Sequence, residues 1–142
     1  MNLSKNFTLA ELCASNTAKA KGIRNVPGVQ EAVNLTALVH KVLQPLREAC
    51  GPIVVASGYR CPQLNKAVGG VASSQHMTGE AAALFIHGDK AYGQRLFDWI
   101  RTHADFDQLI WEHNTKGTSW VHVSYKADGN NRRQVIGNLL KK

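Results

Sequence analysis

The sequence lacks several features that would assign it to a particular class of protein. It has no run of ~18 apolar residues, so no segment predicts a membrane-spanning helix. Its three cysteines, Cys13, Cys50 and Cys61, are odd in number and form no Cys-x-x-Cys pair, which argues against a disulfide framework or a cysteine-based zinc knuckle. No Pro/Ser-rich or Gly-rich stretch is long enough to link two units, so residues 1–142 predict one domain.

The cysteines have two interpretations. Buried free thiols with a packing role are favoured, because an unpaired cysteine behaves as a small hydrophobic residue. The alternative is a nucleophilic Cys61, since the positive charge of Arg60 beside it would favour the thiolate.

Net charge is the main compositional signal. The formal charge of +7 favours an anionic partner, which leaves nucleic acid, a membrane surface and a cell wall as candidates. The basic residues are scattered, with adjacent pairs only at Arg132-Arg133 and Lys141-Lys142, and no repeat of aromatic and basic residues is present. We therefore expect no nucleic-acid module and no membrane partner. A solvated basic surface is the simplest account of the charge.

The first half of the chain predicts helices. Thr8 and Glu11 have the spacing of a capping box, which marks the start of a short helix. Over 28–50, apolar residues recur at intervals of three and four, the pattern of a helix with one buried face. Pro45 would kink this helix and Gly51 would end it. A further amphipathic helix is predicted over 90–103.

The second half predicts strands. Short β-branched or alternating segments indicate strands over 53–57, 79–87, 106–112 and 119–125, and a loop with one helical turn is expected over 61–75. The tail from Lys126 onward is polar until Leu139-Leu140. Helices early and strands later indicate an α+β fold with a small, largely antiparallel sheet flanked by helices.

Two of the six histidines stand in distinctive surroundings. His76 lies in Ser-Gln-His-Met-Thr-Gly-Glu-Ala, at the entrance to a predicted strand. His122 lies in Trp-Val-His-Val-Ser, where alternation places Trp120, His122 and Ser124 on one face and the valines on the other. Taken singly, each is more commonly a structural histidine than a ligand. Structural roles are assigned to the remaining histidines, His40, His87, His103 and His113.

The order of the motifs carries more weight than any one of them. Ser57-Gly58-Tyr59-Arg60, then Ser74-x-His76-x-x-Gly79-x-Ala81, then Trp120-Val121-His122 resemble the zinc D-Ala-D-Ala peptidase family in sequence and spacing. The resemblance extends from Phe7 to Tyr125. It implies a hedgehog/D-Ala-D-Ala peptidase-like fold and a zinc metallopeptidase that hydrolyses peptidoglycan stem peptides, as a carboxypeptidase or as an endopeptidase of the endolysin type.

The resemblance also implies a zinc site. Its ligands would be His76, an aspartate seven residues later, and His122, with the fourth position open for water, as catalytic zinc requires. Ala83 stands where the aspartate should be. A methyl group cannot coordinate zinc, so we expect weak or absent binding and impaired catalysis. Glu80 is expected to face the other side of the strand, where it cannot substitute.

Two explanations of Ala83 remain open. One is a deliberate replacement that inactivates the protein, and the other is a natural family member that only binds. The intact motif around Ala83 favours the first.

The general base is a second open question. Members of this family commonly carry an acidic residue three positions before the second histidine, and Ser119 occupies that position here. Glu112, which ends the predicted strand 106–112 beside Trp111, is the substitute candidate. The alternative is a solvated glutamate at a strand end. Asp107 is a weaker candidate for the base.

Substrate contacts are assigned by the same resemblance. Arg60 would hold the substrate or the developing oxyanion, because a guanidinium pairs well with carboxylate and carbonyl oxygens. Ser74 and Gln75 would orient His76 or bind the peptide, and Ser124 is a candidate contact on the face of His122.

These expectations lead to one predicted function, a peptidase, and one alternative, a binding module. We expect a monomer that binds peptidoglycan stem peptides. Met1 to Phe7 lack the apolar segment of a secretory signal, so we expect synthesis in the cytoplasm and action on the cell wall after release by another route. The rival is a non-catalytic module that binds the wall or another anionic polymer.

Overall fold

The computed structural model describes residues 1–137. Its helical elements are α1 (Leu9–Cys13), α2 (Asn16–Lys21), α3 (Val29–Leu38), η1 (Val39–Leu43), α4 (Gln44–Cys50), α5 (Pro62–Ala67) and α6 (Lys90–His103). Its strands are β1 (Val55–Ser57), β2 (Ala81–Phe85), β3 (Gln108–His113), β4 (Ser119–Ser124) and β5 (Gln134–Ile136). No helix among these elements is long and apolar enough to cross a membrane.

The strands form a single five-stranded sheet in the order β1-β2-β4-β3-β5. Neighbouring strands are antiparallel except for β3 and β5, which run parallel. The expected α+β fold with a largely antiparallel sheet is therefore confirmed. The strand β5 was missed because its three residues are all exposed and lie in a polar segment with no alternation.

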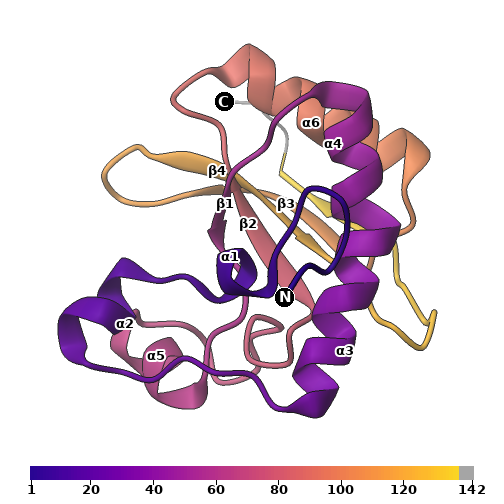
Figure 1. The fold of residues 1–142 in the computed structure, drawn as a ribbon. Coiled ribbons are helices and arrows are strands. Elements are labelled where there is room, and N and C mark those ends of the chain that lie inside the picture. Colours follow the sequence, from indigo (N-terminus) through magenta and orange to yellow (C-terminus); the bar gives the residue numbers. More distant parts are fainter. Residues whose placement is uncertain (138–142) are drawn as a thin grey trace.

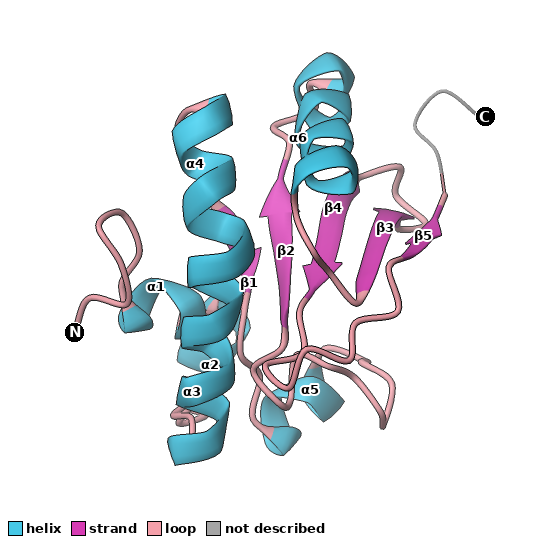
Figure 2. Cartoon of the chain, turned by 90° about the vertical axis from the view of Figure 1, so that its right-hand side faces the viewer, coloured by secondary structure: helices cyan, strands magenta, loops and turns pink. Residues whose placement is uncertain are grey.

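The helices are unevenly distributed about the sheet. The long helix α3–α4 and the helix α6 cover one face, whereas α1, α2 and α5 gather at one end (Figures 1 and 2). The strands turn their apolar residues towards α3–α4 and α6, so that the core lies between these two layers and includes Leu35, Leu38, Val42, Leu84, Leu96, Ile100, Leu109, Trp111, Val121 and Val123. The opposite face of the sheet is left free to line a groove.

The predicted helix over 28–50 is continuous but not uniform. Its middle turn, η1, is a π-helix, and the N–H of Gln44 donates to the carbonyl of Val39, five residues back. Pro45 follows immediately and has no N–H to donate, so the wider turn accommodates it where a kink was expected. Gly51 ends the helix with φ of 86°, as expected.

The start of the chain follows its local signals. Thr8 and Glu11 form the expected capping box, because Thr8 Oγ1 accepts from the Glu11 N–H at 3.1 Å and Glu11 Oε1 accepts from the Thr8 N–H at 3.4 Å. The next helix, α2, was not predicted. Ser15 caps it by accepting from the Ala18 N–H at 3.1 Å.

The remaining sequence expectations differ from the structure mainly at element ends. The strand predicted over 79–87 is limited to β2, because Gly79 and His87 adopt positive φ values of 78° and 55°. Leu139-Leu140 lies outside the described residues. The three cysteines are free and half-buried, and burial raises the pKa of the Cys13 thiol to about 11. This agrees with the favoured packing role for Cys13.

Candidate active site

Three adjacent strands bring the central residues of the site side by side. Ala83 on β2 is the register partner of His122 on β4, and His122 is the register partner of Ile110 on β3. Since side chains alternate along a strand, these three residues share one face of the sheet, opposite the buried Val121 and Val123. The alternation expected for 119–125 is therefore confirmed, and it places His122 over the groove.

His76 comes from a loop that backbone contacts hold against the sheet. Its Nδ1 lies 2.7 Å from the carbonyl oxygen of Gly58, so Nδ1 carries the proton and Nε2 is left to face the groove. The hydroxyl of Ser74 accepts from the His76 N–H at 3.1 Å, and the His76 carbonyl accepts from the Arg60 N–H at 3.0 Å. The loop containing Gly58 and Arg60 and the loop containing His76 are thus fixed to one another.

Two glycines make this close packing possible. A side chain at Gly58 would overlap the backbone of Leu12, and one at Gly79 would overlap the backbone of Glu31. Gly79 also has a φ of 78°, which side chains disfavour. The glycines of the Gly-Tyr-Arg and Gly-x-Ala segments therefore position the histidine loop.

The two imidazoles face each other in the groove. Their ring centroids are 5.3 Å apart with an interplanar angle of 72°. Burial, together with smaller repulsive effects of Arg60 and His122, lowers the pKa of His76 to about 3. Burial also lowers the pKa of His122, with the opposing attraction of Glu112 and the repulsion of Arg60 as smaller effects. Both rings are therefore held neutral, the form that can donate an electron pair to a metal ion.

The residues present supply only two of the three ligands that a catalytic zinc ion requires. Ala83 presents its methyl group to the same face as His122, and it is only 7% exposed. No group of three or more His, Cys, Asp or Glu side chains within residues 1–137 is arranged to hold a metal ion. The donor set here therefore does not fit the zinc site that the sequence motifs imply, and the missing ligand is at position 83.

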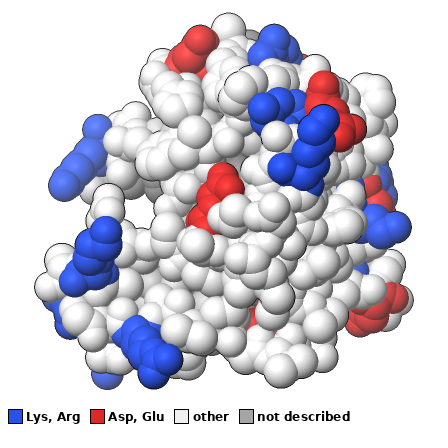
Figure 3. All heavy atoms as spheres, viewed as in Figure 1, with Lys and Arg blue, Asp and Glu red and all other residues white. Residues whose placement is uncertain are grey.

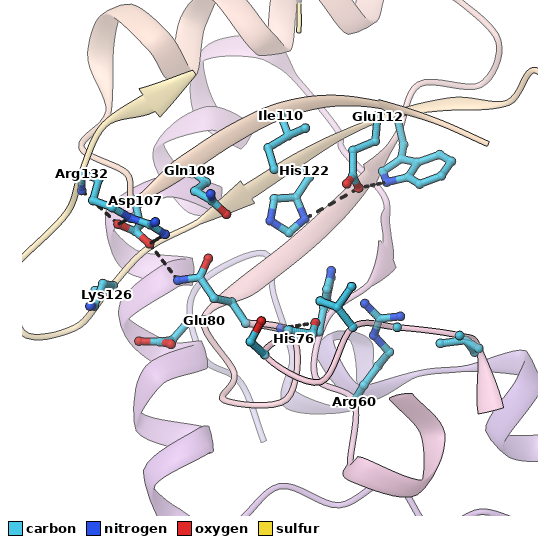
Figure 4. A pocket seen from close by; sticks show the side chains of 18 residues that line it. Arg60, His76, Glu80, Asp107, Gln108, Ile110, Glu112, His122, Lys126 and Arg132 are labelled. Carbon is cyan, nitrogen blue, oxygen red and sulfur yellow. Dashed lines mark hydrogen bonds and ion pairs between the residues drawn. The ribbon is translucent and has the colours of Figure 1, made fainter. Parts of the chain in front are cut away.

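Arg60 and Glu112 lie at the same end of the groove as the imidazoles (Figure 4). Glu112 Oε1 is 4.0 Å from His122 Nδ1 and accepts a hydrogen bond of 2.8 Å from the indole Nε1 of Trp120. Arg60 Nε is buried and finds no hydrogen-bond partner in the described chain. Burial lowers the pKa of Arg60, and the attraction of Glu112 opposes this shift. The Arg60 guanidinium therefore lies beside the histidines, where it lines the groove.

The groove extends from this centre towards Lys126 and Arg132. It encloses a volume of about 630 Å³ and is lined by the loop before His76 and by the outward face of β3 and β4. At its far end Arg132 forms two hydrogen bonds with the carboxylate of Asp107, at 2.9 and 2.7 Å, and Gln75 Nε2 donates to the same carboxylate at 2.8 Å. A volume of this size is typical of a site for a sizeable small molecule or a short peptide.

Comparison with known proteins agrees with this arrangement. The sequence model of a family described as Peptidase M15 matches residues 5–124. The chain belongs to the peptidase M15 family. It is also 40% identical over 81 residues to a zinc D-Ala-D-Ala carboxypeptidase from Streptomyces albus G, a match that covers 56% of this chain and 31% of that protein. The chain thus spans about a third of the length of this curated relative.

Within this M15 chain, four sequence-based site assignments need correction. Ser124, expected to contact substrate, is fully buried and its hydroxyl accepts from the Gln108 N–H at 2.9 Å, so it supports the sheet instead. Asp107, the weaker candidate for the base, is saturated by its donors, and Arg132 holds the pKa of its carboxyl far below the usual range. It therefore has no role as a proton acceptor near neutral pH.

The other two corrections concern orientation. Glu80, expected to face away, lines the groove beside Lys126, at the end remote from Glu112 (Figure 4). Trp111, expected to lie beside the Glu112 carboxylate, points to the opposite face and packs on Phe97 with ring centroids 6.3 Å apart. The indole that contacts Glu112 belongs to Trp120 on the neighbouring strand.

The hydrogen bonds of Gln75 and Arg132 to the Asp107 carboxylate were not predicted from the sequence. Gln75 had been expected to orient His76 or the peptide, but it joins the histidine loop to the start of β3 through Asp107. Arg132 is 25 residues from Asp107, and the pair had no local pattern that would have revealed it. The only sign of this ion pair in the sequence is the adjacent basic pair Arg132-Arg133, which predicts surface charge but no particular partner.

Proposed function

We propose that this chain binds stem peptides of bacterial peptidoglycan in the groove, and that it is an impaired form of a zinc peptidase that hydrolyses them. Membership of the M15 family and the carboxypeptidase relative support the reaction class. The observation that carries the impairment is the register pair of Ala83 and His122, with the His76 ring 5.3 Å from that of His122. Two ligands are in position, and the third position holds a methyl group.

Different residues of the groove would bind the substrate and transfer the proton. A zinc ion with its full ligand set would acidify a water and polarise the scissile carbonyl. In this chain, the guanidinium of Arg60, which lines the groove, would hold a carbonyl or carboxylate oxygen of the peptide. Glu112, oriented by Trp120, would accept a proton from the attacking water. His76 and His122 are neutral, so the two imidazoles add no positive charge to the site.

The decisive experiment restores the ligand. The Ala83 protein and the Ala83→Asp variant are incubated with zinc and purified peptidoglycan, and soluble peptides are identified by mass spectrometry. We expect the variant to bind about one zinc ion per chain and to release peptides, and the Ala83 protein to release few or none. A variant that binds zinc tightly but cuts no wall peptide would contradict the peptidase assignment.

A second candidate function is peptide or wall binding without catalysis. It is favoured by the intact groove of about 630 Å³, which keeps its polar lining although the metal ligand is absent. Co-sedimentation of the Ala83 protein with peptidoglycan would test it. Retention that survives moderate salt supports binding in the groove, whereas loss at low salt indicates only non-specific attraction of the +7 chain to the wall.

A further inference from the structure

Three hollows of the surface meet at Arg60. The groove of about 630 Å³ lies on one side of this residue, and an arm of about 310 Å³ lies on the other, between β1 and the connection from α1 to α2. A third pocket, of about 210 Å³, lies over Ala83 between them. Arg60 lines all three.

The three hollows adjoin one another through shared lining residues, and together they are called the channel. The pocket over Ala83 shares His76, Glu112 and Trp120 with the groove. It shares Ala56 and Ser57 with the arm. The channel therefore passes the histidine pair and continues on both sides of it. Figure 3 shows the surface hollowed beside the β3–β4 hairpin, above the end of the molecule where α2 and α5 lie, with Lys and Arg side chains on either side of the hollow.

The arm has the character of a peptide subsite. Its lining is uncharged apart from Arg60, and its polar side chains include Ser15, Asn16, Thr17 and Ser57. It runs along β1, which is an edge strand of the sheet. An edge strand offers backbone donors and acceptors that an extended peptide can pair with. Hydroxyl and amide side chains add further partners for peptide groups.

Apart from Arg60, the cations that line the groove lie far from the histidines. Lys126 and Arg132 stand at the far end of the groove, with Gln108 and Ile110 between them and Glu112 (Figure 4). Arg132 is already paired with Asp107. Among the described residues that line the arm, Arg60 is the only charged one, and the channel continues beyond it.

We infer that the channel takes a peptide segment that continues on both sides of the His76–His122 centre, as the substrate of an endopeptidase does, and not only a free carboxyl-terminal dipeptide. The inference rests on the proposed function and names its substrate class. Hydrolysis of such a segment adds the hydroxyl of water to the carbonyl carbon and a proton to the leaving nitrogen, and it releases two peptides. Binding of the segment requires no metal, so it is testable in the Ala83 protein itself.

The binding experiment uses synthetic stem-type peptides that contain D-Ala-D-Ala. One peptide ends at this pair, a second is extended beyond it on the carboxyl side, and a third is extended on the amino side. Titration calorimetry with the Ala83 protein is expected to give about tenfold tighter binding for each extension. An extension on the carboxyl side that weakens binding, or leaves it unchanged, overturns the inference.

A variant that blocks the arm makes the test specific. Ala14 is exposed and lines the arm, so Ala14→Trp fills the arm without disturbing the core. It is expected to remove the gain from one of the two extensions and to leave the other unchanged. Ala20→Trp is the matched control, because Ala20 is exposed on α2 and lines none of the hollows. An equal effect of both variants overturns the inference.

Products of the Ala83→Asp variant separate this inference from the proposed function. Cleavage of a carboxyl-extended or carboxyl-amidated peptide at an internal bond supports the inference. Release of only the terminal residue, with no reaction of the amidated peptide, overturns the inference but leaves the peptidase assignment intact. No binding and no cleavage of any of these peptides overturns both.

Discussion

Ala83 and His122 are direct partners across the β2–β4 ladder, and the methyl group of Ala83 lies on the same face as the imidazole. A carboxylate at position 83 would therefore lie on the face of His122 and enter the pocket that His76 also lines. Because this position is only 7% exposed, the carboxylate would be poorly solvated unless a cation accompanied it.

We first predict a zinc-dependent change in stability. Without metal, Ala83→Asp should lower the free energy of unfolding by about 1–3 kcal/mol, the usual cost of a buried polar group without a partner. Zinc at a hundred times its dissociation constant should restore about 2.7 kcal/mol. Thermal unfolding with and without zinc measures both effects. Ala83→Asn is the matched control, and an equal response to zinc in that variant would exclude a carboxylate ligand.

A second prediction concerns the base. In the Ala83→Asp background, Glu112→Gln should lower kcat by about 100-fold or more while zinc content stays unchanged. The control is Glu80→Gln, because Glu80 lines the same groove at the end remote from the histidines. Kinetics on a synthetic stem peptide, with metal analysis of each variant, provide the test. Similar kcat values for both variants would remove Glu112 from the mechanism.

The third prediction is that Asp107 stabilises the fold and does not act in catalysis. Asp107→Asn should lower the free energy of unfolding by about 2–4 kcal/mol near neutral pH, because Arg132 and Gln75 lose a buried charged acceptor. Asp105→Asn is the control, since Asp105 pairs with Arg133 but its side chain is about half exposed. That change should cost less than about 1 kcal/mol. Urea unfolding measures both.

The pH dependence of this contribution has a defined sign. Arg132 depresses the pKa of Asp107 in the folded chain. The stabilisation is therefore fully present above the unfolded pKa of about 3.9 and is lost as the pH falls below it. The difference between the original chain and Asp107→Asn should shrink in acid. A difference that stays constant from pH 7 to pH 2 would contradict the ion pair.

A fourth prediction uses Gly79, where positive φ and close packing occur together. Gly79→Ala should destabilise the fold by more than about 2 kcal/mol, because the new methyl group meets the backbone of Glu31. At Gly88, φ is also positive but no atom lies within 4 Å of an added side chain. Gly88→Ala should therefore cost only about 1 kcal/mol. Equal costs would show that the contact with Glu31 is unimportant.

The fifth prediction is that His76 stays neutral over the physiological range. Burial lowers its pKa to about 3, so its ring resonances should not shift between pH 5 and pH 8 in NMR titrations. The same residue in denaturant should titrate near pH 6.5. The unfolded chain then binds the extra proton, so this histidine lowers stability as the pH falls from about 6.5 towards 3 and has no effect above that range.

Local patterns in the sequence predicted much of the fold and part of the site. Alternation along β4 was sufficient to place His122 opposite Val121 and Val123, because side chains in a strand have a period of two. The capping box at Thr8 and the glycine at position 51 fixed two helix ends. These features depend only on neighbours within one element.

Features that depend on distant contacts were not predictable in this way. The orientation of Glu80 follows from the positive φ of Gly79, which turns the chain before β2 begins. The burial of Ser124 follows from its bond to the Gln108 N–H, and the role of Asp107 follows from a partner 25 residues away. The indole beside Glu112 comes from a neighbouring strand, whereas sequence proximity had suggested Trp111. Each of these depends on tertiary structure.

The hydrogen bond from His76 Nδ1 to the Gly58 carbonyl fixes the His76 ring without a metal ion. Both imidazoles are held by the backbone and the sheet, so their placement does not depend on a metal ion. Two of the four alanine codons differ from an aspartate codon by a single nucleotide. We therefore expect that one point mutation can remove or restore the third ligand while the scaffold persists, so that loss of activity in such a lineage is reversible in one step.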